Sequence, residues 1–87
     1  MSDPALDSLR SRVAETDREI LELVNRRLEL VGEILRHKQA NGMPFVDAGQ
    51  EERLLARLRE LNGGPLSADG VERLFRELLD LIKRELE

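Results

Sequence analysis

The chain has 87 residues, enough for a single domain, 1–87, that hides only about 60–65% of the surface its unfolded form exposes. It has no cysteine and one histidine, which excludes disulfides, thiolate chemistry and a zinc site with cysteine ligands. Charged residues make up 37% of the chain and aromatic residues 2%, and the net charge is −4. This balance argues against a nucleic-acid partner, because such binding needs cations for the phosphates and aromatic rings for the bases.

No segment of the sequence predicts a membrane span or an export signal. Apolar residues occur in short runs between charged ones, far short of the roughly 20 consecutive residues that a span requires. Residues 1–4 have neither a basic start nor an apolar stretch. The sequence therefore predicts a soluble cytoplasmic protein without a membrane partner.

The first predicted element is a long helix over residues 4–41. Asp3 and Pro4 favour a helix start, because aspartate accepts hydrogen bonds from free N–H groups and proline is tolerated in the first turn. Apolar residues then recur at steps of three and four, which is the helical period. They are Leu6, Leu9, Val13, Ile20, Val24, Leu28, Val31 and Leu35. Gly42 and Pro44 end the helix.

This helix is longer than the globule that the chain could form alone. At about 1.5 Å per residue it spans roughly 55 Å, whereas a compact chain of this size is roughly 30 Å across. Its apolar stripe runs along the whole helix, so part of the stripe needs cover from outside the chain. The same surface of a second copy is the simplest cover, which predicts a homodimer.

Two shorter helices are predicted to follow. Asp47 with Gln50 three residues later resembles a capping box for a second helix that ends near residues 62–65. Ser67 can cap a third helix that continues to the end of the chain. Their apolar positions are Leu54, Leu55, Leu58 and Leu61, then Val71, Leu74, Phe75, Leu78, Leu79, Ile82 and Leu86. The predicted fold class is all-α, with helices in the order long, short, medium.

Several charged residues lie close to the apolar faces of these helices. On a helical wheel, Arg10, Asp17, Arg27 and Lys38 fall within about 60° of the centre of the long stripe. Glu51 points to the same side as the leucines of the second helix. Each residue alone fits a structural role, such as an ion pair or a cation whose head reaches water. Together, three cations in an apolar interior predict a pocket for a small anion.

The residue types in this pocket limit its chemistry. Two arginines suit two carboxylates, while a lysine supplies a compact positive charge for a single atom. The inward-facing set contains no serine, cysteine or histidine, and no cluster of metal ligands. We therefore expect no metal and no covalent intermediate, so that any reaction would be electrostatic and conformational.

Several motifs, spread over nearly all of the chain, match one known family in residue type and spacing. They are Leu9-Arg10 with Asp17, Asn25-Arg26-Arg27, Lys38, Pro44 with Asp47, Glu51, and Arg73-Leu74-Phe75. With these motifs the sequence resembles the all-helical chorismate mutases of the AroQ class. The resemblance implies an intertwined homodimeric helical bundle in which the long helices pair and each active site is completed by the partner.

The resemblance also implies a role for each inward charge. Arg10 of one subunit and Arg27 of the other would hold the two carboxylates of chorismate, and Lys38 would donate to the ether oxygen of the breaking bond. Glu51, with Asp47, would position the ring hydroxyl. The implied reaction is the Claisen rearrangement of chorismate to prephenate, on the route to phenylalanine and tyrosine, without a cofactor.

Three expected substrate-binding positions depart from the family's pattern. Gln50 stands where arginine is common, Ile82 where serine is usual and Leu86 where glutamine or glutamate is usual. These departures leave two alternatives to a chorismate mutase. One is a mutase or lyase acting on a chorismate analogue such as aminodeoxychorismate or isochorismate. The other is a weakly active regulatory domain that partners a shikimate-pathway enzyme.

Overall fold

The computed structural model describes residues 3–87, which form three helices. Helix α1 spans Pro4–Ala40, α2 spans Gln50–Leu61 and α3 spans Ala68–Glu85. The predicted all-α fold class and the order long, short, medium are confirmed. Met1 and Ser2, on which part of the expectation about export rested, lie outside the described residues.

Two of the predicted helix caps are confirmed. The Asp3 carboxylate accepts hydrogen bonds from the N–H groups of Ala5 at 3.0 Å and Leu6 at 3.2 Å, at the start of α1. The Ser67 hydroxyl oxygen accepts one from the N–H of Gly70 at 3.0 Å, at the start of α3. Each side chain satisfies N–H groups that have no partner within the helix, which fixes where the helix begins.

The predicted capping box of α2 is wrong. The residue before the helix is Gly49, at φ 80°, and no side chain caps the helix there. The side-chain oxygen of Gln50 instead accepts a hydrogen bond from Arg53 at 3.1 Å. The Asp47 carboxylate lies 3.5 Å from the same guanidinium group. The chain therefore enters α2 through a left-handed residue, a conformation that glycine adopts without strain.

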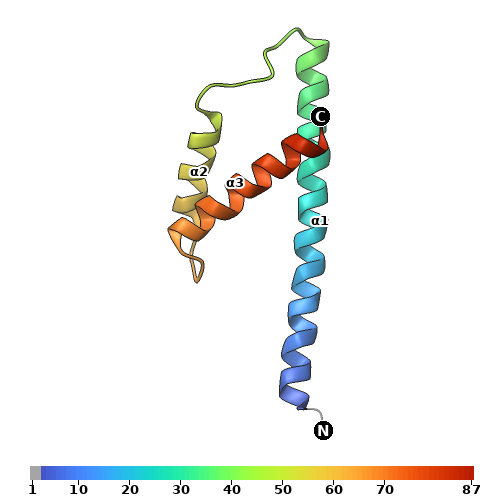
Figure 1. Ribbon diagram of the computed structural model, residues 1–87, viewed down its shortest axis with the longest axis vertical. Coiled ribbons are helices and arrows are strands. Elements are labelled where there is room, and N and C mark those ends of the chain that lie inside the picture. The colour runs from blue at the N-terminus through green and yellow to red at the C-terminus, as the bar shows by residue number, and fades with distance from the viewer. Residues whose placement is uncertain (1–2) are drawn as a thin grey trace.

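Helix α3 links the other two helices. It crosses from α2 to α1 and contacts both, so that α2 lies beside α3 while the N-terminal half of α1 extends beyond them (Figure 1). The molecule measures 62 × 24 × 18 Å, with a radius of gyration of 17.2 Å. A compact chain of this length would have a radius of gyration near 12 Å. The structure is elongated because α1 is longer than the rest of the fold.

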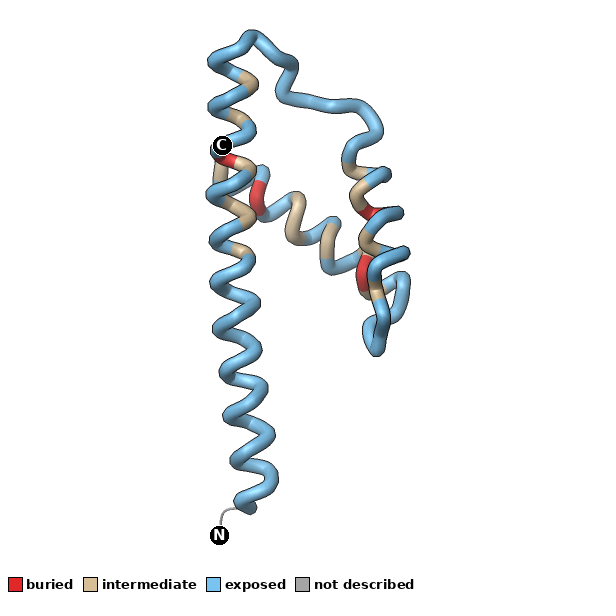
Figure 2. Tube along the Cα trace, turned by 180° about the vertical axis from the view of Figure 1, so that it is seen from behind, coloured by how far each residue is buried: buried red, intermediate tan, exposed pale blue. Residues whose placement is uncertain are grey.

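The small apolar core lies along α3. The buried apolar residues are Leu55 of α2 together with Val71 and Ile82 of α3, seen as the red segments along these helices (Figure 2). Gly32, where α3 meets α1, is also buried. Packing along α3 therefore fixes the position of its last turns relative to both other helices.

The N-terminal half of α1 is exposed along its length (Figure 2), and its apolar residues are exposed with it. Leu6, Leu9, Val13 and Ile20 are each between 41% and 60% exposed. Within residues 3–87, no helix is both long and apolar enough to cross a membrane. The exposed stripe is the surface that the sequence predicts a second copy to cover.

Candidate active site

A cavity of about 620 Å³ lies between α1, the start of α2 and the end of α3. Helix α1 contributes Arg27 and Lys38 to its lining, with apolar residues between them. The loop before α2 and the first turn of that helix contribute residues 45–52, and α3 contributes Ile82 and Lys83. The cavity therefore has charged groups on every wall and an apolar surface between them.

The two cations on the α1 wall, Arg27 and Lys38, are half-buried. Lys38 donates a hydrogen bond from Nζ to the backbone carbonyl of Phe45 at 3.3 Å. Among residues 3–87, neither Arg27 nor Lys38 forms an ion pair. Partly desolvated cations without a partner favour an anionic ligand, because the ligand supplies the missing charge.

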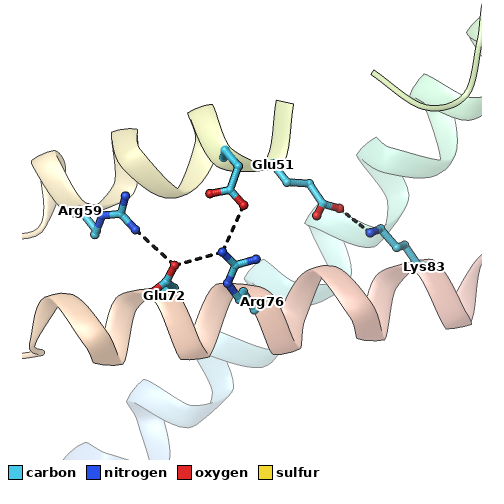
Figure 3. Close-up of polar contacts among 6 residues, drawn as sticks. Glu51, Arg59, Glu72, Arg76 and Lys83 are labelled. Atoms are coloured by element: carbon cyan, nitrogen blue, oxygen red, sulfur yellow. Dashed lines mark hydrogen bonds and ion pairs between the residues drawn. The ribbon is translucent and has the colours of Figure 1, made fainter. Parts of the chain in front are cut away.

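Lys83 is a charged residue of the cavity that the sequence analysis missed. Its ammonium group forms an ion pair with the Glu51 carboxylate, which joins α3 to α2 across the cavity wall (Figure 3). The hydrogen bond to Glu51 raises the pKa of Lys83 above its ordinary value. The signal in the sequence is the position of Lys83 directly after Ile82, at the edge of the apolar stripe of α3.

The other acids of the cavity pair with cations that do not line it. Asp47 lies 3.5 Å from Arg53, and Glu52 lies 3.2 Å from Arg76. Hydrogen bonds to Glu72 and Glu52 raise the pKa of Arg76, so this group stays charged. Each acid of the lining therefore has a cation of its own. Within residues 3–87, Arg27 and Lys38 are left without an acid of their own, which suits a ligand with two negative charges.

Most of the predicted site residues come together at this cavity. The residues in its lining are Arg27, Lys38, Asp47, Gln50, Glu51 and Ile82. Leu86 is not brought to the cavity, because it forms the C-terminal cap of α3 and packs over Gly32 of α1. The polar group that this end of α3 offers to the cavity is Lys83.

Arg10 lies far from the cavity of its own chain. It is exposed on the N-terminal half of α1, and roughly 25 Å of helix, at 1.5 Å per residue, separates it from Arg27. An arginine side chain cannot cover that distance. Arg10 therefore does not contribute to the cavity of its own chain.

The sequence and the fold match one family. Residues 9–86 match the model of the family described as chorismate mutase type II. Two solved structures of chorismate mutase from Thermus thermophilus, forms II and I, superpose with TM-scores of 0.85 each, at 35% and 36% identity. The superposition with form II covers 92% of this chain and 91% of the form II chain. The superposition with form I covers 90% of this chain and 98% of the form I chain.

Curated relatives match this chain over a short part of their own length. The T-protein of Haemophilus influenzae is 36% identical over 76 residues, which is 86% of this chain and 20% of that protein. The bifunctional chorismate mutase/prephenate dehydratase of Stutzerimonas stutzeri is 34% identical over 79 residues, or 85% of this chain and 22% of that protein. The chain thus spans about a fifth of the length of these relatives.

Proposed function

We propose that this chain, which belongs to the chorismate mutase type II family, converts chorismate to prephenate in the cavity between its three helices. The observation that carries the proposal is the pair of half-buried cations, Arg27 and Lys38, that no acid neutralises among residues 3–87. Chorismate carries two carboxylates, so it supplies the two negative charges that this wall lacks. The apolar residues between the cations suit its ring and enolpyruvyl arm.

The reaction is a rearrangement within one molecule, and it needs no group transferred from the protein. The ether C–O bond breaks while a C–C bond forms between the enolpyruvyl carbon and the ring. Arg27, with Arg10 of a second copy, would hold the two carboxylates and fold the arm over the ring, close to the reactive geometry. Lys38 would meet the negative charge that develops on the ether oxygen as the bond breaks.

The opposite side of the cavity would orient the ring. Glu51 at the start of α2 would accept the hydrogen bond of the ring hydroxyl, and Asp47 in the preceding loop would help to position it, with Gln50 beside them. Ile82, which is buried in α3, would give the ring an apolar surface. These residues position the substrate, and the cations of α1 supply most of the stabilisation of the transition state.

A homodimer is part of the proposal. The exposed stripe on the N-terminal half of α1 supports it, because burying apolar side chains is the main driving force of association. The position of Arg10 supports it independently, since each cavity would receive this cation from the other copy. One contact between the long helices would thus cover the stripe and complete two sites.

The activity can be tested with one substrate and a pair of adjacent variants. The purified protein should remove the diene absorbance of chorismate, and Arg27→Met should lower kcat/KM by at least about 100-fold. Arg26→Met is the matched control, because Arg26 is exposed and does not line the cavity. It should retain activity. Equal activity of the two variants, or an inactive wild-type protein, would contradict the proposal.

A further inference from the structure

The cavity holds a third cation, which stands on a different wall from the other two. Lys83 comes from α3, whereas Arg27 and Lys38 come from α1, and all three line the same space. We propose that Lys83 is a substrate-binding residue that bridges Glu51 and one carboxylate of the bound substrate. This inference rests on the proposed function, since it names a further contact for the same dianion.

The fold holds Lys83 in a fixed place at the cavity. The preceding residue, Ile82, is buried and also lines the cavity, so the backbone at this turn is anchored by packing. The Lys83 side chain itself is 59% exposed, which leaves the ammonium group open to an incoming ligand. An ammonium group has three N–H donors, so one can stay on Glu51 while another binds a substrate oxygen.

The ion pair with Glu51 prepares the lysine for this contact. The carboxylate of Glu51 directs the Lys83 ammonium group toward α2 (Figure 3). A bound substrate would exclude water from the site, and ionic interactions strengthen where water is excluded. The ionic interactions of Lys83 would then be stronger in the complex than in the free protein, and this difference would add to the binding free energy.

A purely structural role explains this lysine less well. Two other pairs, Arg76 with Glu52 and Arg59 with Glu72, already join α3 to α2 (Figure 3). Exposed ion pairs also add little to stability. What separates Lys83 from Arg59 and Arg76 is that it lines the cavity, and they do not.

The test compares Lys83→Met with Arg76→Met, a matched control in which α3 also loses a cation that pairs with a glutamate of α2. Methionine keeps much of the length of either side chain and removes the charge. Lys83→Met should raise KM for chorismate about 10- to 100-fold and change kcat by less than about threefold, as for loss of a charged hydrogen bond used in binding. Lys83→Arg should recover part of the loss, because the charge returns. Arg76→Met should leave KM within about twofold of wild type.

Three outcomes would overturn the inference, and they differ from one another. An unchanged KM in Lys83→Met, with an active wild-type protein, would remove the lysine contact and leave the proposed function standing. An equal rise of KM in both variants, together with an equal fall in thermal midpoint, would show a clamp between α2 and α3. A wild-type protein that does not turn over chorismate would overturn the proposed function and this inference with it.

Discussion

Two inactive variants should restore activity when they are mixed, because the proposed site takes Arg10 from one copy and Lys38 from the other. Along α1, roughly 42 Å of helix separates these residues at 1.5 Å per residue, so one copy cannot bring both to one cavity. Arg10→Ala and Lys38→Ala homodimers would each lack one cation at both sites. A hybrid dimer would have one site with both lesions and one site with neither.

The size of the recovery follows from this arrangement. Random exchange of subunits in an equimolar mixture gives hybrids as about half of all dimers, and half of the sites in each hybrid are intact. The mixture should therefore regain about a quarter of the wild-type activity at the same total protein concentration. A site built within one copy would regain none.

The assay mixes the two variants, exchanges subunits in mild denaturant and measures loss of chorismate after refolding, with hybrid formation checked by native mass spectrometry. The matched control mixes Arg27→Ala with Lys38→Ala, whose residues line the same cavity of one chain. Every hybrid site then keeps one lesion, so no recovery is expected. Recovery in the control, or none in the test mixture despite hybrid dimers, would refute the shared site.

Three further predictions concern single changes. Lys38→Met should lower kcat/KM at least about 100-fold, because the charge that meets the ether oxygen is lost. It should not lower the free energy of unfolding, because Lys38 is a half-buried cation with no opposite charge among the described residues. Turnover and denaturant unfolding measure the two effects. Gly49→Ala should lower the free energy of unfolding by about 1–2 kcal/mol, because φ is 80° there, while Gly63→Ala, without a positive φ, should not. The ion pair with Glu51 raises the pKa of Lys83, so the pair stabilises the folded state at pH values below the unfolded lysine pKa of about 10.4. This contribution is at most about 1 kcal/mol, and it is lost as the pH rises further and the lysine loses its proton. Unfolding free energies of wild type and Lys83→Met should therefore converge as the pH rises past that value.

The helices could be predicted from the sequence because their signals are local. The apolar period of α1 and the Asp3 cap lie within the helix or directly beside it. The start of α2 could not be predicted in the same way. Asp47 and Gln50 have the spacing of a capping box, yet the chain enters the helix through Gly49 in a left-handed conformation. That conformation depends on the path of the whole loop between α1 and α2.

The residues of the candidate site also differ in whether a local signal in the sequence predicts them. Arg27 and Lys38 could be found on a helical wheel, because both belong to one helix and face one side. Lys83 could not, since its place at the cavity depends on how α3 crosses α2 and brings it to Glu51. Ile82 and Leu86 lie on the apolar stripe of α3, whereas Lys83 lies about 100° from Ile82 at the edge of that stripe, so α3 alone does not show whether Lys83 meets the neighbouring helix.

Identification of the product formed from chorismate tests the central claim most directly. The folded wild-type protein, incubated with chorismate and followed by NMR, should yield prephenate as the sole product, with the enolpyruvyl carbons retained on the ring. Release of pyruvate would indicate a lyase, and unchanged chorismate in the presence of the folded dimer would show that the cavity does not catalyse the rearrangement. Either result would contradict the assignment of Arg27 and Lys38 to the rearrangement.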